Sequence, residues 1–386
     1  MGKPTIRSAL PPIYAHVLSP IFDAPKVEES RATCDACQMC DQGEKGPRAE
    51  AATTFFHPDT KCCTFYPALP NYLVGAILSD ERPEMEEGKR RIREKIAAKV
   101  GVLPQRLAPS KKWSVLYAAA MESSFGRSAL LKCPYLGEDS RCTIWSHREA
   151  VCFSFFCKYD LGAYGSELWN EMKAYLATTE KLLSTWAAKE LWPDVKDFRH
   201  PTGSTLTLEE LEERPDATYA EAWGEWQGRE EAFYVACHER VKAMSRDEFA
   251  KVVDKTTAGR NQLAKLGTVI ENLRAARHVP SRIALNKKLT VLPVDSGVVL
   301  TMPYNGHDSI KIENDLYEVL QMFSHDRTVA ETRDVLEKEH GVELADELLS
   351  MFTMHEIMVG PPVGGICESA GPPVLLGARC AAPPKK

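Results

Sequence analysis

Residues 133–157 read CPYLGEDSRCTIWSHREAVCFSFFC and carry four of the chain's twelve cysteines. Eight, nine and four residues separate successive thiols, and proline, glycine and polar residues make up most of the first interval. Such residues favour turns, while thiolates are soft ligands that select zinc, copper(I) or iron–sulfur clusters. The stretch therefore predicts a loop-rich region that bound metal holds together.

A second cysteine-rich stretch, TCDACQMC at residues 33–40, spaces its three thiols three residues apart. Cluster-binding loops supply three thiolates from such a run and take a fourth from elsewhere, often a cysteine followed by proline. Cys133, which precedes Pro134, is a candidate for that remote ligand. Zinc sites more often use two separated C-x-x-C pairs. The spacing therefore favours an iron–sulfur cluster and leaves zinc open as the alternative.

The cysteines concentrate in one part of the chain. Nine of the twelve are predicted metal ligands: Cys34, Cys37, Cys40, Cys62, Cys63, Cys133, Cys142, Cys152 and Cys157. The first residues show no secretory signal, so we expect a reducing cytoplasm and metal binding in place of structural disulfides. We interpret Cys237 as a buried small hydrophobe and Cys367 and Cys380 as tail thiols.

Composition limits the class of protein. The 386 residues leave room for two or three domains, and 44% hydrophobic with 26% charged residues is ordinary for a globular chain. The net charge of -6 argues against general nucleic-acid binding, which usually needs a basic excess. No apolar stretch is long enough to cross a bilayer. We therefore expect neither nucleic acid nor membrane as a partner.

The stretch at 133–157 resembles the YkgJ-type cysteine-cluster family, a zinc- or iron-chelating domain with the approximate pattern C-P-[FY]-L…C-x-I-[YW]-x-x-R-P-x-x-C-R-x-F-x-C. The matching residues are Cys133, Pro134, Tyr135, Leu136, Cys142, Ile144, Trp145, Arg148, Cys152, Phe155 and Cys157. The sequence departs from the pattern at Glu149, where the family prefers proline, and at Phe153, where it prefers arginine. The resemblance covers about residues 31–165 and implies a metal-binding domain there.

The family's upstream element is C-x-x-C-x-x-C-C. The three evenly spaced cysteines match it, but Asp41 stands in place of the last cysteine. We expect the pair Cys62-Cys63, which follows about twenty residues later, to supply the missing thiol. The assignment of individual ligands therefore stays open, while the metal-binding class does not depend on it.

Other side chains near the thiols allow two interpretations each. His57 and His147 are candidate ligands, although a lone histidine beside cysteines is more often only a neighbour. Aromatic residues also flank the thiols: Phe55, Phe56, Phe65, Tyr66, Trp145, Phe153, Phe155 and Phe156. They are either the core of a metal-stapled domain or a shell that excludes water and tunes a cluster's potential.

We predict an α+β, mostly helical fold in five parts. These are an N-terminal extension (1–30), a loop-rich, metal-stapled cysteine domain (31–165), a helical region (166–284), a small winged-helix-like module (285–362) and a disordered Pro/Gly-rich tail (363–386). The charged segment ERPEMEEGKRRIREKIAAKV in the cysteine domain predicts a solvated helix face.

The helical region gives clear local signals. Residues 166–192 space their leucine, methionine and tryptophan residues as a helix does. Thr207-x-x-Glu210 and Ser245-x-x-Glu248 are capping-box patterns, which predict helix starts.

Residues 288–360 change character. Two β-rich runs, KLTVLPV and GVVLTMPY, are joined by DSG, a hairpin-like turn. Asn314 predicts one helix start, and Thr328-x-x-Glu331 predicts a second helix that ends at Gly341; a third helix and an IMVG strand follow. This order resembles the PqqD-like fold, which implies recognition of a peptide that adds a strand to the exposed sheet edge. A winged helix used for packing or dimerisation is the alternative.

These features predict a cysteine-cluster metalloprotein, with an iron–sulfur cluster or iron favoured over zinc. We expect it to take part in redox or metal-assisted modification of a peptide or protein substrate bound by residues 285–362. The alternative is a non-catalytic zinc-binding scaffold or partner-interaction protein. The sequence holds no glycine-rich phosphate loop and no nucleophile elbow, so no catalytic residue is assigned and catalysis stays open.

Overall fold

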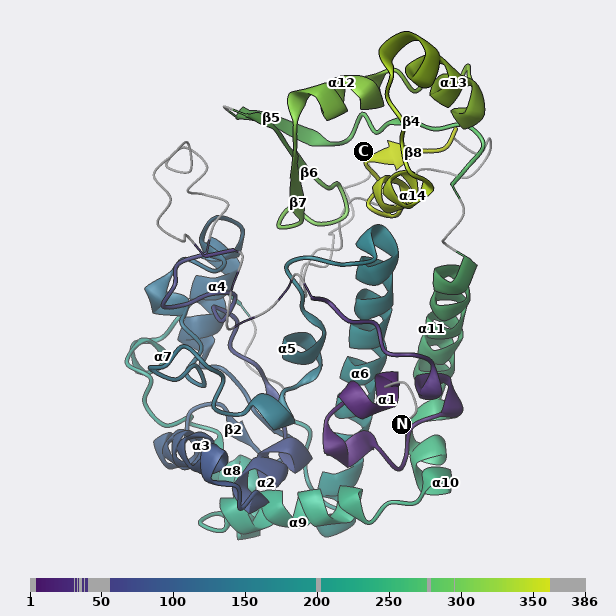
Figure 1. The fold of residues 1–386 in the computed structure, drawn as a ribbon. Helices are drawn as coiled ribbons and strands as arrows, with labels where there is room; N and C mark the ends of the chain where they lie inside the picture. The colour runs from purple at the N-terminus through teal and green to yellow at the C-terminus, as the bar shows by residue number, and fades with distance from the viewer. Residues whose placement is uncertain are drawn as a thin grey trace, which may run out of the picture. The chain divides into compact units, whose positions relative to one another are not determined.

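The computed structural model describes residues 5–30, 32, 34, 37, 39–40, 56–198, 203–275, 279–294 and 296–361. It is a mixed α/β structure in which helices predominate and the strands form small antiparallel sheets (Figure 1). The expected α+β, mostly helical class is confirmed at this level. Within these ranges, no helix has the length and apolar character needed to span a membrane. The predicted tail, with Cys367 and Cys380, lies outside the described residues.

The chain divides into two compact units. The first comprises Met1–Asp160 and Glu167–Ala275, and the second comprises Leu161–Ser166 and Ala276–Lys386. The cysteine-rich segment and the helices that follow it therefore belong to one unit. Each unit has a core of its own.

The first unit is mainly helical. Its helices are α1 (Ile6–Ala9), α2 (Asn71–Ser79), α3 (Glu86–Ala98), α4 (Lys111–Ser124), α5 (Ala150–Ser154), α6 (Gly162–Leu191), α7 (Leu208–Leu211), α8 (Tyr219–Trp223), α9 (Glu230–Lys242), α10 (Arg246–Phe249) and α11 (Thr257–Ala275). The start of α6, up to Ser166, belongs to the second unit. Helices α2 and α9 pack most closely, at Gly75. A Cβ atom there would lie 2.0 Å from the carbonyl oxygen of Tyr234, so this approach requires glycine.

A small sheet anchors the core of this unit. Strands β1 (Leu69–Pro70), β3 (Arg106–Leu107) and β2 (Val102–Leu103) pair antiparallel in that order. Trp223 Nε1 donates to the Val102 carbonyl and Tyr234 Oη to the Leu103 carbonyl, both at 2.8 Å. Both rings are fully buried, so these bonds satisfy their polar atoms while the rings fill the core.

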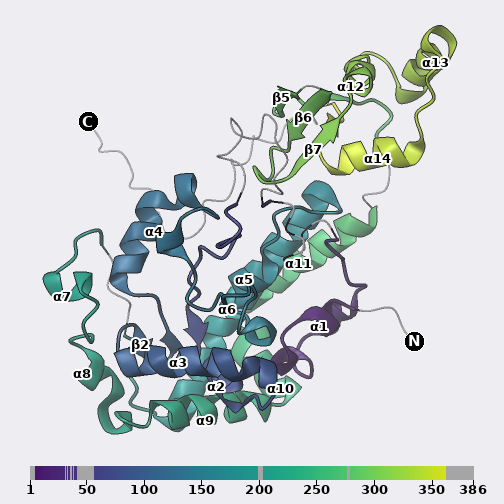
Figure 2. The same ribbon diagram turned by 60° about the vertical axis from the view of Figure 1, so that its left-hand side comes forward.

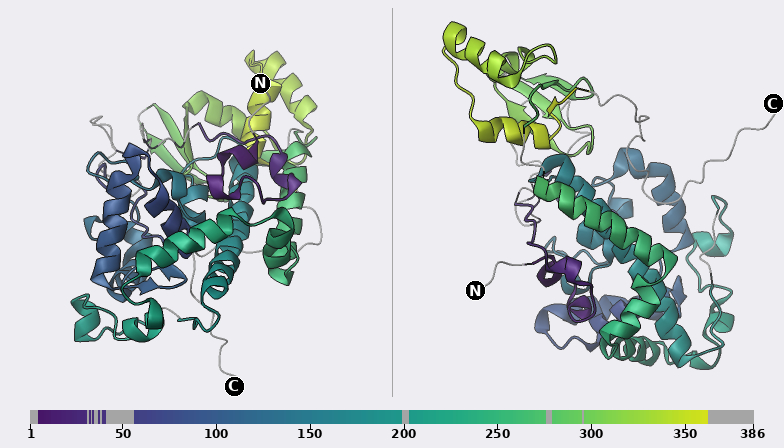
Figure 3. Two further views of the ribbon diagram at one scale, coloured as in Figure 1. Left: turned by 90° about the horizontal axis from the view of Figure 1, so that it is seen from below. Right: turned by 90° about the vertical axis from the view of Figure 1, so that its right-hand side faces the viewer.

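The N-terminal segment is part of the same core. Phe22, in the 3-10 helix η2 (Pro20–Asp23), packs on Tyr175 of α6 with 5.1 Å between ring centroids. The neighbouring Ile21 reaches Gly267 of α11. In Figure 3 this segment is the purple ribbon that lies beside the helices of the first unit. The expected N-terminal extension is thus folded onto the first unit over residues 5–30.

Several local predictions in the first unit are confirmed. The helix expected at 166–192 is α6. Thr207 with Glu210, and Ser245 with Glu248, form reciprocal capping boxes at the starts of α7 and α10. The charged segment contains α3, but this helix also buries Ile92 and Ile96, so it is not only a solvated face.

The second unit combines two small sheets with three helices (Figure 2). Its elements are β4 (Ala284–Leu285), β5 (Thr290–Val294), β6 (Gly297–Thr301), β7 (Ser309–Ile312), α12 (Asn314–Gln321), α13 (Val329–His340), α14 (Asp346–Met354) and β8 (Met358–Val359). Strands β5, β6 and β7 form an antiparallel sheet in that order, and β4 pairs with β8. Leu300 of the sheet packs with Leu320, Leu336 and Phe352 of the helices in one core.

The predicted elements of this unit are largely confirmed. The two β-rich runs pair as a hairpin, with Val294 opposite Gly297, although Asp295 of the turn lies outside the described residues. Thr328 and Glu331 form a capping box, and Gly341 ends α13 at φ +65°. The N-cap of α12 is Glu313, one residue before the expected Asn314. The strand β7 had not been predicted.

Candidate metal centre

Two turns present Cys133 and Cys142 in the same way. The Tyr135 N–H donates to Cys133 Sγ at 3.4 Å, and the Ile144 N–H donates to Cys142 Sγ. In both cases the donor lies two residues after the cysteine. Leu136 and Cys142 pair antiparallel between the turns. Because N–H donors favour a thiolate over a thiol, both turns are suited to present sulfur as a ligand.

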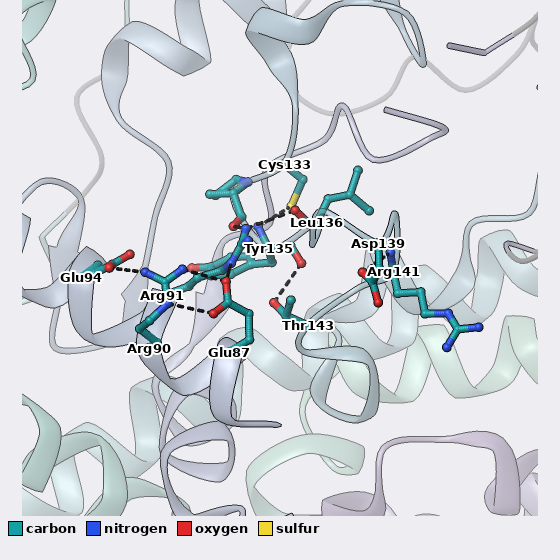
Figure 4. Close-up of polar contacts among 11 residues, drawn as sticks. Glu87, Arg90, Arg91, Glu94, Cys133, Tyr135, Leu136, Asp139, Arg141 and Thr143 are labelled. Carbon is teal, nitrogen blue, oxygen red and sulfur yellow. Dashed lines mark hydrogen bonds and ion pairs between the residues drawn. The ribbon is translucent and has the colours of Figure 1, made fainter. Parts of the chain in front are cut away.

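Arg91 of α3 stabilises the first of these turns through hydrogen bonds to its backbone (Figure 4). Its Nη1 atom donates to the carbonyls of Pro134 and Leu136, and its Nε atom donates to Glu87 at 2.6 Å. The Thr143 Oγ1 and N–H both donate to the Tyr135 carbonyl at 2.9 Å. The sequence did not point to Arg91, because nothing in its position along α3 indicates that its side chain contacts a loop more than forty residues away.

The vicinal pair Cys62-Cys63 lies against the first turn. The Cys133 N–H donates to the Cys63 carbonyl at 2.8 Å. The Cys62 thiol donates to the Cys63 sulfur. The preceding Lys61 has a positive φ of 47° and donates from Nζ to the carbonyls of Cys34, at 2.7 Å, and Ser140, at 3.1 Å. Lys61 therefore connects the upstream cysteines with the loop before Cys142.

Glu149, which stands where the YkgJ-type pattern prefers proline, has a structural role at the start of α5. It is the N-cap of α5, where its carboxylate accepts from the N–H groups of Val151 and Cys152, each at 2.8 Å. Cys152 is thereby placed on the first turn of a short helix. The Glu180 carboxylate accepts from the Ala150 N–H at 2.7 Å, so two buried carboxyl groups share this helix end.

Burial, with the negative charge of Glu149, raises the pKa of Glu180 well above its usual value of 4.5. Burial also raises the pKa of Glu149, although the two N–H bonds oppose the shift. Both shifts favour protonation of this pair in the folded protein.

The three evenly spaced cysteines lie beside Cys157. The Cys40 N–H donates to the Cys37 carbonyl at 3.1 Å, and the Cys40 thiol donates to the Cys37 sulfur. Cys157 is close enough to Cys37 and Cys34 to interact with them electrostatically. Cys34 is exposed, whereas Cys37, Cys40 and Cys157 are half-buried.

Most of these thiols are held in the neutral form. Burial is the main cause that raises the pKa of Cys40 to about 12 and those of Cys142 and Cys157 to about 11. Burial likewise raises the pKa of Cys133 and Cys152. Binding a metal ion to such thiols must displace protons, and the ion supplies the positive charge that burial makes necessary.

Cys63 is the exception. The hydrogen bond from Cys62 lowers the pKa of the Cys63 thiol, and the charges of Lys61 and Arg148 act in the same direction against burial. The guanidinium of Arg148 stacks 3.4 Å from the ring centroid of Trp145 and donates to the carbonyls of Trp145 and Cys152. It also interacts electrostatically with the thiols of Cys34, Cys62, Cys142 and Cys152, so one cation faces thiols from three chain segments.

A cavity of ≈ 850 Å³ opens beside the thiols. Four cysteines contribute to its wall: Cys34, Cys62, Cys63 and Cys142. Trp145, Phe153, Phe156 and Trp169 supply aromatic surface, and Arg148 and Lys61 supply charge. A cavity of this size and character is typical of ligand-binding sites, so a substrate group could reach the thiols from this side.

The donor set fits a thiophilic metal, but the thiols do not converge on one point. Among the residues that the structure describes, no three histidine, cysteine, aspartate or glutamate side chains are close enough together to hold one ion. The candidate histidines have other partners: His147 Nε2 lies 2.7 Å from Asp80 Oδ2, and His57 Nδ1 accepts from the Asp59 N–H. Of the aromatic residues expected near the thiols, Trp145, Phe153 and Phe156 line the same cavity as four of the cysteines, and Phe55 lies outside the described residues.

Compared with models of protein families, with curated proteins and with solved structures, the chain gives no significant match. The resemblances to the YkgJ-type and PqqD-like families therefore remain predictions that rest on the motifs.

Proposed function

We propose that this chain is a cysteine-cluster metalloprotein that binds iron, as an iron–sulfur cluster, or zinc through the cysteines of residues 34–157. One observation carries the proposal. Nine thiols from three chain segments gather in one region, and each interacts electrostatically with at least one other. A reducing compartment such as the cytoplasm would keep them available for metal.

The charge balance of this region favours a multivalent cation. Nine thiolates would carry nine negative charges, and the cations that act on them include Lys61, Arg148 and Lys158. Buried charges without partners are costly. Bound metal would remove that cost, because it replaces the thiol protons with positive charge.

The bound group would supply either electron transfer, as an iron–sulfur cluster, or Lewis acidity and structural support, as zinc. The chain's own residues do the rest. Arg148 offsets negative charge on the sulfurs, the aromatic walls limit water, and the cavity admits a substrate group. A redox or metal-assisted modification of a peptide or protein would use these features.

The metal content of the purified protein distinguishes a bound iron–sulfur cluster from bound zinc. We expect protein purified without oxygen to contain iron and sulfide and to show a broad absorption near ~400 nm, typical of thiolate-ligated clusters. Zinc with a colourless spectrum would shift the function to a non-catalytic, partner-binding scaffold. The paired turns at Cys133 and Cys142 are compatible with this second candidate, since zinc ribbons also present thiolates from turns. Protein without bound metal would contradict the proposal.

For the second unit we propose peptide recognition at the free edge of β5. Met302 directly follows β6, and its N–H donates to the carbonyl of Asp308, which directly precedes β7. The hydrogen-bonding groups of successive residues in a strand point alternately to the two sides. Val299 and Thr301 therefore face β5, which leaves Val291 and Pro293 facing the outer edge. Val291 and Leu292 are exposed, at 37% and 48%. A free strand edge with exposed apolar side chains suits strand addition by a peptide.

A backbone substitution tests this edge. Val291→Pro removes the outward N–H and keeps the pairing with β6, whereas Val291→Thr keeps the N–H and serves as the control. We expect the wild type and Val291→Thr to capture peptides from a displayed random library, and Val291→Pro to lose them. Equal capture by all three proteins, or capture by none, would contradict the proposal.

A further inference from the structure

We propose that the cavity beside the thiols binds an aromatic carboxylate and that Arg148 receives its carboxylate group. The cavity volume of ≈ 850 Å³ is within the range of small-ligand sites. A free aromatic acid and an aromatic residue at the carboxyl terminus of a peptide share this chemistry. The inference names a substrate class for the proposed function, and it rests on that function for the modification that follows binding.

Hydrogen bonds fix one wall of the cavity, which includes residues 26–30 and Trp169 of α6. Glu29 is buried and accepts from Trp169 Nε1 at 2.8 Å and from the Asp160 N–H at 2.5 Å. The N–H and Oγ of Ser30 donate to Asp160 Oδ2 at 2.8 and 2.5 Å. These bonds hold the wall in place by themselves, and such preorganisation lowers the cost of binding.

Aromatic side chains give the cavity flat apolar surface. Phe156 and Trp169 pack together with 4.7 Å between ring centroids, and the Phe153 ring lies 6.0 Å from that of Trp169. Trp145 lines the same cavity and is 50% exposed, so part of its ring is uncovered. Aromatic rings pair favourably with one another. A ligand that carries an aromatic ring therefore suits these walls.

The charges in the walls favour an anion. Basic side chains lie 3.9 Å from Glu28 and 3.7 Å from Glu84, and Glu29 accepts the two bonds given above. Lys61 and Arg148 are half-buried and donate to backbone carbonyls. Among the described residues, no carboxylate lies within ion-pair distance of either cation. A positive charge withdrawn from water without a counter-charge is costly, and an anionic ligand would reduce that cost.

Arg148 has a donor to spare for this anion. Its guanidinium stacks 3.4 Å from the Trp145 ring centroid and lies 5.7 Å from that of Phe153. The Nε and Nη1 atoms donate to carbonyls, whereas Nη2 has no hydrogen-bond partner in the part of the chain that the structure describes. A carboxylate would accept a charge-assisted bond from Nη2. A phosphate group, with nearly two charges and three acceptor oxygens, would need more donors than this.

Fluorinated probes test the ligand class. We would follow para-fluorophenylpropionate by fluorine NMR with the full-length protein, and compare it with its neutral amide and with the aliphatic acid trifluorohexanoate. We expect the aromatic acid to bind at least about tenfold more tightly than either, because each control lacks one of the two recognised groups. A tripeptide that ends in para-fluorophenylalanine distinguishes the sources: affinity equal to that of the aromatic acid identifies a peptide terminus, and weaker binding identifies a free acid.

Two arginines of the same cavity give matched variants. Arg148→Leu should lower the affinity for the aromatic acid to that of its amide. Arg141→Leu removes the same charge from an exposed residue of the cavity wall and should keep the preference for the acid. Equal binding of acid and amide by the wild type would overturn the inference, and this comparison needs no variant to fold.

The site and the proposed metal binding fail in different ways. Protein that contains no metal but binds the aromatic acid would keep the site and refute the metal. Metal-loaded protein that binds none of the probes would refute the site and leave the proposed metal binding standing.

Discussion

At the scale of single residues, two cations hold the loops that carry the thiols, and both do so through backbone carbonyls. Arg91 donates to Pro134 and Leu136, and Lys61 donates to Cys34 and Ser140. Hydrogen bonds from charged donors contribute more to stability than exposed ion pairs do. These side chains are therefore structural parts of the candidate site, although neither is a ligand.

Arg91 and its neighbour Arg90 form a matched pair for testing this role. We expect Arg91→Met to lower the free energy of unfolding by about 1.5–3 kcal/mol, because the bonds to the Cys133 turn are lost. Arg90 is exposed and pairs with Glu87 and Glu94, so Arg90→Met should cost less than about 1 kcal/mol. Urea unfolding measures both. Equal losses would show that Arg91 acts only as a surface charge.

The buried pair Glu149 and Glu180 predicts a pH dependence of stability. The pKa of Glu180 is raised in the folded protein. When the pH exceeds the pKa that Glu180 has in the unfolded chain, the folded state therefore binds more protons than the unfolded state does. The stability that Glu180 contributes is therefore fully present below its unfolded-state pKa, and it is lost as the pH rises through its folded-state pKa.

Glu180→Gln should remove this loss, because the amide oxygen can still accept from Ala150 without titrating. We expect the wild type to lose stability from about pH 5 upward, relative to the variant. The control is Glu190→Gln on the same helix, where the carboxylate is half-exposed and pairs with Arg240. Unfolding free energies at a series of pH values test it, and parallel curves for the wild type and Glu180→Gln would refute the assignment.

At the scale of elements, the sequence predicted what local chemistry decides. The capping boxes at Thr207, Ser245 and Thr328 formed as expected, because each needs only residues three apart. The β5–β6 hairpin followed from its short turn for the same reason. The burial of Ile92 on α3 and the contact of Arg91 with the Cys133 turn depend on partners far along the chain, and no local pattern encodes them.

The candidate site shows the same division. Spacing predicted nine thiols as metal ligands, which stays a prediction, and the structure places all nine in the first unit. Spacing could not group them, because grouping depends on how the turns at Cys63, Cys133 and Cys142 meet in space. Glu149 appeared in the sequence only as a departure from proline, and its role as N-cap of α5 needed the structure.

The α2–α9 contact gives a prediction at this scale. Gly75→Ala would place a Cβ atom 2.0 Å from the Tyr234 carbonyl oxygen, and such overpacking should cost about 1–3 kcal/mol of stability. Gly267→Ala is the control, because its Cβ would lie 3.5 Å from Ile21 in ordinary contact. It should stabilise α11 by up to about 1 kcal/mol through helix propensity. Thermal unfolding distinguishes the two, and equal shifts in both variants would contradict this packing.

At the scale of the whole molecule, the nine thiols all belong to the first unit, and the described residues of the second unit carry no cysteine. Because each unit has its own core, we expect two unfolding transitions. Removing the metal with a chelator should destabilise only the first unit. Its free energy of unfolding should fall by at least about 3 kcal/mol if the ion was present well above its dissociation constant. Differential scanning calorimetry before and after chelation measures this, and an equal shift of both transitions would refute separate units.

The central claim is that these thiols bind metal, and alkylation of each cysteine tests it most directly. Protein purified without oxygen would be treated with iodoacetamide before and after metal removal, and modification would be mapped by mass spectrometry. We predict that the nine thiols of residues 34–157 are protected until the metal is removed, while Cys237, fully buried in α9, stays protected in both states. If these nine thiols react at the same rate before and after metal removal, the account is contradicted.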